Sequence, residues 1–506
     1  MPLQYKEYGV VKKIRGCIVT IEGLENCING QLVKFGFGTE GVIIGFNEDE
    51  THALIVKEKE TLRTGSQAMT VLEPFNTPVG EKFVGRVVNV LGEPLDNLGS
   101  IEVDEYRPIF AEAPSVLERD IIKETFETGI KIIDTMLPIG RGQRQLVLGD
   151  RMTGKTTICT DAILNQKGKG VICIYCCIGK SKSALDRVVN LFKERDVFEY
   201  SLIVAALAGT SPGQQYLAPY VACSLGEYFM YKGGHVFIAF DDFTRHAWAY
   251  REISLLLNRP PGRESYPGDI FYLHSRMIER AAKLSKEKGG GTMTFFPVIE
   301  TLEGDLTGYI PTNLVSMTDG QIYLSAPLFG EGFRPAIDLG LSVSRVGNKV
   351  MWPALRKLSG SLRLDFLQYR ERLKVSTLKV GSYESEEAAA EMRSGEIVTE
   401  LLKQDKESPV PMEEQVILFY GFSKKLIHEL EKEEIVKLKR DIFKFVQRKY
   451  PGLIKEIREK KILTEEIEKQ IRQVYIEFIE LLREKEEENL DERKEKVGEE
   501  TLAGKK

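Results

Sequence analysis

Long apolar runs are missing from this chain of 506 residues. No stretch approaches the roughly 18 to 20 uninterrupted apolar residues that a membrane helix needs. The N-terminal stretch, MPLQYKEYGVVKKIRG, has no apolar core of the signal-peptide kind. The pattern predicts a cytosolic chain without a membrane span of its own. Its hydrophobic content of 42% is still enough for two or three domains with substantial cores.

A basic excess is missing as well. The formal net charge is −5, and acidic and basic residues are mixed along the whole length. Nucleic-acid binders more often carry a basic excess or a basic stripe. The charge balance therefore argues against a nucleic-acid partner.

Cysteines are few and follow no recognised spacing. Their number is odd, and no CxxC pair is followed by a second pair. This excludes a zinc site of the paired kind and a disulfide framework. Because most of them stand inside apolar runs, we expect buried, reduced thiols at positions 17, 27, 159, 173, 176, 177 and 223.

The first two parts of the chain differ in the length and spacing of their apolar runs. Residues 1–72 contain short β-branched runs, among them GCIVTIEG and EGVIIGFN, separated by turns at a spacing of ~10 residues. This is typical of a small antiparallel β-barrel. Residues 73–355 alternate continuous apolar runs, such as VICIYCC and HVFIAFDD, with helix candidates such as KSALDRVVNLFKERD. The alternation predicts a doubly wound α/β domain whose strands are covered on both faces.

Helices replace strands in the last third of the chain. Residues 356–482 are predicted to form a helical bundle, and Thr464 begins one of its helices. Residues 483–506 have almost no apolar content, so we expect a frayed helix or a disordered tail. The apolar positions of the helix after Thr464 recur every three or four residues: Ile467, Ile471, Val474, Phe478 and Leu481.

The stretch LVLGDRMTGKTT, residues 146–157, has the GxxxxGK[ST] spacing of a phosphate-binding loop. Its glycines allow backbone N–H groups to turn onto phosphate oxygens. Lys155 is expected to contact the β- and γ-phosphates of ATP or ADP, and the Thr156 hydroxyl to face Mg²⁺. The residues expected to surround the nucleotide here are Gly149, Asp150, Arg151, Met152, Thr153, Gly154, Lys155, Thr156 and Thr157.

Two carboxylates end the run HVFIAFDD. A strand-end carboxylate about 90 residues after a phosphate loop can hold bound Mg²⁺ through its water shell, although such residues are often only helix caps. We expect Asp241, rather than Asp242, to serve Mg²⁺ in this way.

Several long blocks resemble the α subunit of F-type ATP synthase. The blocks are PIGRGQRQLVLGDRMTGKTT, QQYLAPYVACSLGEYF, LLLNRPPGRESYPGDIFYLHSRMIERAAKLS, VIETLEGDLTGYIPTNLVSMTDGQIYL, RPAIDLGLSVSRVG and SPVPMEEQVILFYG. The resemblance runs from about residue 8 to about residue 450. It implies a β-barrel, a RecA-like nucleotide domain and a helical domain. It also implies a ring of alternating α and β subunits around a rotating γ shaft, at the cytoplasmic face of the cell membrane.

Lys180 stands where the catalytic relatives of this family carry a glutamate. Hydrolysis needs a group that orients and activates water, usually a carboxylate. The matching stretch here is CCIGKSKSALD, and α subunits usually have glutamine at this position. A charged lysine cannot act as that base, so we expect this chain to bind nucleotide without hydrolysing it, with Lys180 near a phosphate.

The resemblance implies roles for other residues. Arg345, in LSVSRVG, matches the family's arginine finger, which acts on the catalytic site of the neighbouring β subunit. Arg334 and Pro335 match the block that lines the adenine pocket. Gln404 matches the first glutamine of a Gln-x-Gln step beside adenine, whereas Lys406 replaces the second.

The beginning of the chain departs from the family pattern. The family's N-terminal helix, which contacts the δ subunit of the peripheral stalk, has no counterpart here. The sequence therefore does not support the usual δ or peripheral-stalk contact. Membrane association is expected only through the complex, which couples ATP to the movement of protons or sodium ions.

Two other classes of ring protein share part of this pattern. A self-sufficient export ATPase of the flagellar or type III secretion class needs the catalytic glutamate, and position 180 is lysine. An RNA-translocating ring of the Rho class needs a basic or aromatic RNA face on the first domain, and none is apparent. Hydrolysis by the isolated chain, with or without RNA, would distinguish them.

Overall fold

The computed structural model describes residues 6–59, 61–376 and 386–483. The chain divides into two compact units. One consists of Met1–Thr128 and Ile139–Val350, and the other of Gly129–Pro138 and Met351–Lys506. The predicted tail, 483–506, lies outside the described residues except for Arg483. The predicted domain boundaries stay a prediction.

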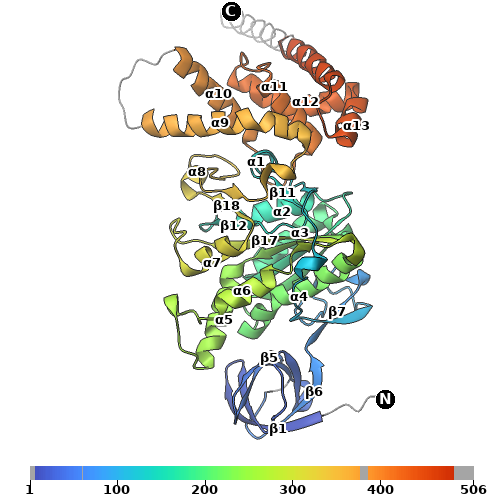
Figure 1. Cartoon of the computed structure of the whole chain (residues 1–506), viewed down its shortest axis with the longest axis vertical. Coiled ribbons are helices and arrows are strands. Elements are labelled where there is room, and N and C mark those ends of the chain that lie inside the picture. The colour runs from blue at the N-terminus through green and yellow to red at the C-terminus, as the bar shows by residue number, and fades with distance from the viewer. Residues whose placement is uncertain (1–5, 60, 377–385, 484–506) are drawn as a thin grey trace, which may run out of the picture. The chain divides into compact units, whose positions relative to one another are not determined.

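The N-terminal part of the first unit is a closed six-stranded barrel with the order β1-β2-β5-β4-β3-β6, drawn in blue in Figure 1. All its neighbouring strands are antiparallel. Val19, Val33 and Ala53 are fully buried inside it. The predicted barrel is confirmed. Its strands are β1 (Lys6–Arg15), β2 (Ile18–Glu22), β3 (Gln31–Phe35), β4 (Glu40–Phe46), β5 (Thr51–Lys57) and β6 (Gln67–Pro74).

The centre of the first unit is a nine-stranded sheet with the order β19-β18-β12-β17-β15-β13-β14-β8, and β16 pairs with β17. The strands from β18 to β8 are parallel, whereas β19 and β16 are antiparallel to their neighbours. The predicted α/β domain is confirmed. The strands are β8 (Val87–Val88), β12 (Leu146–Gly149), β13 (Val171–Lys180), β14 (Ser201–Leu207), β15 (His235–Asp241), β16 (Ala282–Lys283), β17 (Thr292–Glu300), β18 (Gly320–Leu324) and β19 (Val343–Ser344).

Helices and short ribbons complete the first unit. Two small antiparallel sheets, β7 (Asn76–Val79) with β9 (Glu105–Pro108) and β10 (Thr125–Phe126) with β11 (Ile139–Gly140), lie outside the main sheet. The helices are α2 (Lys155–Leu164), α3 (Lys182–Glu194), α4 (Pro212–Tyr231), α5 (Phe243–Leu256), α6 (Ile270–Ile278), α7 (Tyr309–Met317) and α8 (Ala326–Gly330).

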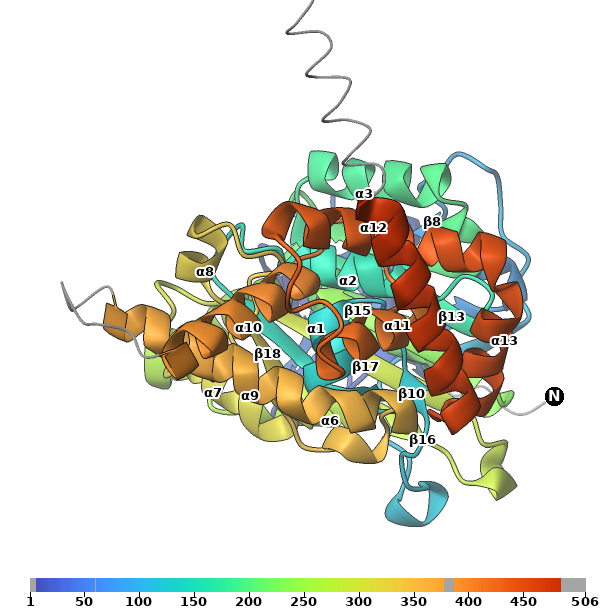
Figure 2. The same cartoon turned by 90° about the horizontal axis from the view of Figure 1, so that it is seen from above.

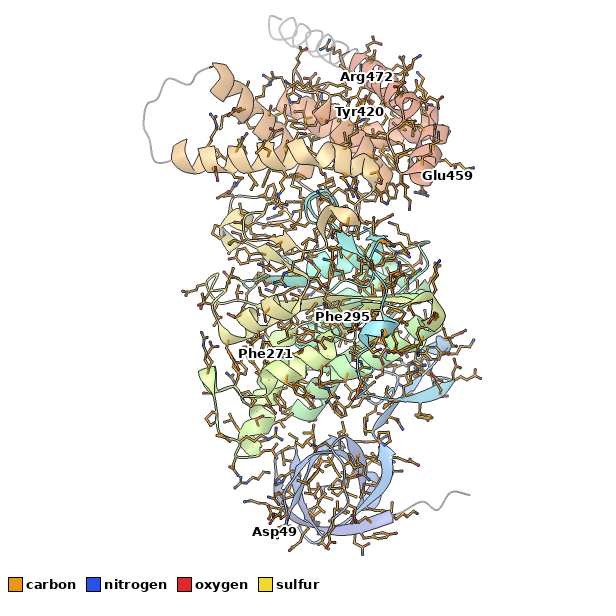
Figure 3. The ribbon with its side chains drawn as sticks, viewed as in Figure 1. Asp49, Phe271, Phe295, Tyr420, Glu459 and Arg472 are labelled. Carbon is orange, nitrogen blue, oxygen red and sulfur yellow. The ribbon has the colours of Figure 1, made fainter. Side chains whose placement is uncertain are left out.

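Successive residues of β13 face opposite sides of the sheet, and both sides are covered. Ile174 and Cys176 join the apolar core that includes α4. Tyr175, between them, packs edge-on against Phe192 of α3, with ring centroids 6.3 Å apart. Phe295 of β17, labelled in Figure 3, is also fully buried. Strands buried on both faces need continuous apolar sequence, which explains the runs seen in the chain.

The second unit is helical in its described residues. Its helices are α1 (Lys131–Met136), α9 (Pro353–Ser376), α10 (Glu386–Leu402), α11 (Met412–Ser423), α12 (Lys432–Lys449), α13 (Pro451–Lys460) and a last helix over 465–483. The pair α9 and α10 lies side by side (Figure 2). Thr464 caps the last helix by accepting a hydrogen bond from the backbone of Ile467 at 3.3 Å. Arg472 of that helix donates to the hydroxyl of Tyr420 at 3.2 Å; Figure 3 labels both residues. The predicted helical region is confirmed.

The prediction of buried, reduced thiols is confirmed. All seven cysteines are free thiols and buried. Within residues 6–59, 61–376 and 386–483, none of the helices combines the length and the apolar character that crossing a membrane requires.

Candidate functional site

The loop between β12 and α2 has the backbone conformation that its glycines predict. Gly149 has φ of +157°, and a Cβ there would lie 2.5 Å from the carbonyl oxygen of Leu324. Gly154, with φ of +103°, is the N-cap of α2 and offers no side chain to its first N–H groups. Met152 has φ of +63°, and its side chain is 91% exposed. The first turn of α2 is therefore left open toward an anion.

Lys155 lies inside this loop. Its side chain is buried, and Nζ donates to the carbonyl oxygens of Gly149 at 2.8 Å and Asp150 at 2.5 Å. Burial lowers the pKa of Lys155 below its ordinary value. The loop carbonyls hold the ammonium at the place where phosphate oxygens would compete for it.

Other side chains of the loop tie it to the segment after β17. The carboxylate of Asp150 accepts hydrogen bonds from the Thr301 hydroxyl at 2.6 Å and the Gly304 backbone at 2.9 Å. Arg151 pairs with Glu300 at 3.0 Å. These contacts give Asp150 and Arg151 a structural role in fixing the loop.

Two further threonines of this segment have contacts within the loop and α2. The Thr153 hydroxyl donates to the carbonyl of Asp150 at 2.8 Å. Thr157 is half-buried on α2, and its carbonyl accepts a hydrogen bond from Thr160 at 3.1 Å.

Asp241, at the end of β15, is contacted by several polar side chains. One of its carboxylate oxygens, Oδ2, accepts hydrogen bonds from the hydroxyls of Thr156 at 2.6 Å and Tyr175 at 2.8 Å. The other, Oδ1, faces Nζ of Lys180 at 2.8 Å. The Asp241 side chain is 1% exposed. The structure thus brings together the predicted site residues Thr156, Lys180 and Asp241.

Asp242 has a different task from Asp241. Its side chain caps α5 by accepting a hydrogen bond from the backbone of Arg245 at 2.9 Å. It also lies 3.5 Å from Lys180. Burial raises the pKa of Asp242, and the ammonium of Lys180 opposes that rise. Asp242 is thus the helix cap, and the choice of Asp241 as the metal candidate stays a prediction.

The charge of Lys180 is held by these carboxylates. Burial alone would lower the pKa of Lys180, but the carboxylates Asp241 and Asp242 outweigh it and raise the pKa above its ordinary value. Lys180 is therefore an ammonium at neutral pH. It stands at the position where the sequence predicts that a general base is missing.

Thr156 and Asp241 fit a magnesium ion that arrives with a nucleotide. A hydroxyl and a carboxylate oxygen are hard donors, and the two lie 2.6 Å apart at the start of α2. Among the residues that the structure describes, no group of three or more histidine, cysteine or acidic side chains is arranged to hold a metal by itself. The ion would therefore depend on phosphate and water for its other ligands.

Arg345 and Arg334 lie on exposed segments after the core strands. The backbone of Arg345, directly after β19, donates to the carbonyl of Asp319 at 2.8 Å, while its side chain is exposed. The Arg334 guanidinium lies 4.9 Å from the ring centroid of Phe329, and its peptide bond to Pro335 is cis. Neither arginine contributes to the cluster around Asp241.

Gln404 belongs to the helical unit and is engaged there. Its amide nitrogen donates to the carbonyls of Gly129 and Ser408, each at 2.8 Å. Its amide oxygen accepts a hydrogen bond from the backbone of Lys131 at 3.0 Å. Lys406 is exposed and pairs with Glu407 at 3.2 Å. The amide of Gln404 therefore serves as a clip within its own unit.

Sequence reasoning missed Tyr175 and Glu300. Tyr175 is a polar-tipped aromatic inside the apolar run VICIYCC, and Glu300 is the acidic end of TMTFFPVIE. Either could have been noticed as a polar group in or at the end of a buried strand. Their partners, Asp241 and Arg151, could not be read from spacing because they lie on other strands and loops.

Comparison with known proteins gives consistent matches. Residues 129–344 match the family described as ATP synthase alpha/beta family, nucleotide-binding domain. Residues 352–478 match the ATP synthase alpha/beta chain, C terminal domain. The chain is 44% identical over 470 residues to ATP synthase subunit alpha of Clostridium botulinum strain Eklund 17B, covering 93% of each chain. It is 44% identical over 476 residues to ATP synthase subunit alpha of Clostridium acetobutylicum, covering 94% of each.

Proposed function

Because this chain belongs to the ATP synthase alpha/beta family, we propose that it is the non-catalytic α subunit of an F-type rotary ATP synthase. It binds ATP or ADP at the phosphate loop and does not hydrolyse it. It supplies Arg345 to the catalytic site of the neighbouring β subunit. The complex couples the interconversion of ATP and ADP to ion movement across the membrane.

The Lys180–Asp241 ion pair, with Nζ 2.8 Å from Oδ1, carries the non-catalytic part of the proposal. A general base must be able to accept a proton from the attacking water. The raised pKa of Lys180 keeps it protonated. The nearby carboxylates are also engaged: Asp241 by Thr156, Asp242 by the start of α5 and Glu300 by Arg151.

The chain's own residues account for nucleotide binding. Backbone N–H groups of the loop and the first turn of α2 bind phosphate oxygens, and Lys155 adds a positive charge. Mg²⁺, when it accompanies the nucleotide, neutralises phosphate charge and would be held by Thr156 and, through water, by Asp241. Arg334 and Pro335 are proposed to line the adenine pocket.

The finger role of Arg345 is supported by its exposure. A finger stabilises the charge that spreads over the transferring phosphoryl group in the transition state. Such a residue must be free to leave its own chain's surface. The exposed guanidinium of Arg345 follows the short edge strand β19, which suits this role.

The partners follow from the same proposal. We place the chain in an alternating ring with β around γ, peripheral to the cytoplasmic face of the cell membrane. A self-sufficient ring ATPase would need a free carboxylate at position 180, where Lys180 stands.

The test compares the full chain alone with the complex reconstituted from its partners. The isolated chain should bind MgATP and turn it over far more slowly than ~1 s⁻¹, whereas the complex should hydrolyse ATP at ordinary enzyme rates. Steady-state phosphate release and equilibrium ATP binding measure the two quantities. Turnover of about 1 to 100 s⁻¹ by the isolated chain, with or without RNA, would contradict the proposal.

A further inference from the structure

Both oxygens of the Asp241 carboxylate lie against groups of this chain. Oδ2 accepts hydrogen bonds from two hydroxyls, and Oδ1 faces an ammonium at 2.8 Å. A carboxylate that serves only a metal-bound water would keep one oxygen available for it. Here a cation of the protein already stands on that oxygen.

The local backbone directs Lys180 to this place. Strands β13 and β15 are neighbours, and Cys177 lies opposite Asp241 in their register. The pairing of β13 with β14 shifts register between Ile178 and Lys180. Gly179, in the shift, has φ of +62°, and a Cβ there would lie 2.9 Å from Cβ of Arg245. The irregular end of β13 thus fixes Lys180 beside Asp241 rather than leaving it in solvent.

The two buried carboxylates at the end of β15 are matched in number by two ammonium groups. Asp241 and Asp242 are buried carboxylates, while Lys155 and Lys180 are the two ammonium groups in the cluster. Asp241 therefore already has a cation of this chain beside it when a nucleotide binds. Without Lys180, a second cation would be needed to separate the phosphates from Asp241.

We propose that Lys180 is a built-in counter-cation of Asp241 that makes nucleotide binding at this site largely independent of Mg²⁺. The inference rests on the proposed nucleotide-binding function. The ammonium takes the electrostatic role that a divalent ion would have between Asp241 and the phosphates. Mg²⁺ still fits beside Thr156, but binding does not require it.

The experiment measures ATP affinity of the full-length chain in buffer with Mg²⁺ and in buffer with excess EDTA. In the unchanged chain the two dissociation constants should agree within about threefold, as expected for the loss of a weak, solvent-screened charge contact. In Lys180→Gln the constant in EDTA should exceed that in Mg²⁺ by about thirtyfold or more, because Asp241 is left buried without a cation. Isothermal calorimetry reports both constants without relying on enzyme activity.

Three further variants test the charge of residue 180, its position and the integrity of the fold. Lys180→Arg keeps a cation and should keep the small ratio. Lys182→Gln removes an exposed lysine two residues away and should leave both constants unchanged. The double variant Lys180→Gln with Asp242→Asn keeps the net charge and the α5 cap, so it guards against a folding failure. It should show the same dependence on Mg²⁺ as Lys180→Gln.

Each alternative outcome has a definite meaning. A large EDTA effect in the unchanged chain, with tight binding in Mg²⁺, would overturn the inference and leave the proposed function standing. Equal loss of affinity in both buffers for folded Lys180→Gln would place the ammonium on the phosphates and overturn the inference. ATP binding by the double variant that stays independent of Mg²⁺ would also overturn the inference. Absence of ATP binding in either buffer would overturn the proposed function together with the inference.

Discussion

The phosphate loop and the Arg345 segment differ in how far this one chain completes them. At the loop, Lys155 contacts loop carbonyls, Lys180 faces Asp241, and Arg151 pairs with Glu300. The Arg345 side chain is exposed, and no ion pair for it is found in the described part of the chain. A site whose charged groups have partners within the chain can bind a ligand without a neighbouring subunit. An exposed guanidinium that follows a short edge strand and has no ion pair in the described part of the chain is suited to act on something outside the chain.

The largest effect that would test this comparison is expected from Arg345→Ala. If Arg345 acts on a neighbour's site, turnover of the reconstituted complex should fall by ~10³ to 10⁵. MgATP binding to the variant chain should not change, because the loop is untouched. Steady-state ATPase activity of the complex measures turnover, and MgATP binding to the isolated variant chain measures affinity.

Arg345→Lys serves as the matched variant. It keeps the charge but loses the planar fork, so it should restore turnover only in part. Near-normal turnover in Arg345→Ala would remove the finger role. Loss of nucleotide binding in the isolated variant would instead move Arg345 into the chain's own site.

Lys155→Ala should have the next largest effect, and this effect should fall on nucleotide binding at the phosphate loop. Removing the buried ammonium leaves phosphate charge without its partner, so MgATP affinity should fall by about a hundredfold or more. Calorimetry on the isolated chain measures this. Lys167→Ala, which removes an exposed lysine paired with Asp196 in the same unit, is the control and should bind normally. Unchanged affinity in Lys155→Ala would mean that the loop is not the nucleotide site.

Lys180→Glu sharpens the distinction between binding and hydrolysis. It gathers three carboxylates in one buried cluster, so ATP affinity should fall by about tenfold. Hydrolysis by the isolated chain should stay negligible, since no neighbour supplies an arginine to this site. Phosphate release over hours is the measurement. A large gain in turnover would show that a carboxylate was the only missing component.

The smallest effect on nucleotide affinity is expected from Gln404→Ala. Because its amide is engaged with Gly129, Lys131 and Ser408, MgATP affinity should change by less than about threefold, while the helical unit loses about 1 to 3 kcal/mol of unfolding free energy. Calorimetry and denaturant unfolding separate the two. A large loss of affinity with unchanged stability would favour direct contact with adenine.

The buried strands and the last helix could be predicted from local sequence alone. The runs VICIYCC and HVFIAFDD became β13 and β15 because strands covered on both faces must be apolar throughout. The spacing around Thr464 predicted the helix over 465–483. In contrast, the first barrel strand, β1, has no distinct apolar run, because most of its side chains are exposed and its alternation is weak.

The partners within the site could not be predicted in the same way. The sequence indicated that Lys180 is not a base, but not that its ammonium faces Asp241. That contact depends on the order and register of β13 and β15, which spacing does not encode. The clip role of Gln404 likewise depends on residues 129 and 131 joining the helical unit, far from position 404 in the chain.

The burial of every cysteine gives the chain a built-in reporter of its own opening. Burial raises the pKa of Cys159, Cys173 and Cys176 well above the ordinary value for a thiol, so thiolate, the form that attacks alkylating reagents, is scarce in the folded state. The rate of maleimide labelling of the native chain should therefore report how often the chain unfolds, rather than how many thiols lie on its surface. For the same reason, a cysteine placed on the surface should react with a fluorophore faster than the buried thiols do.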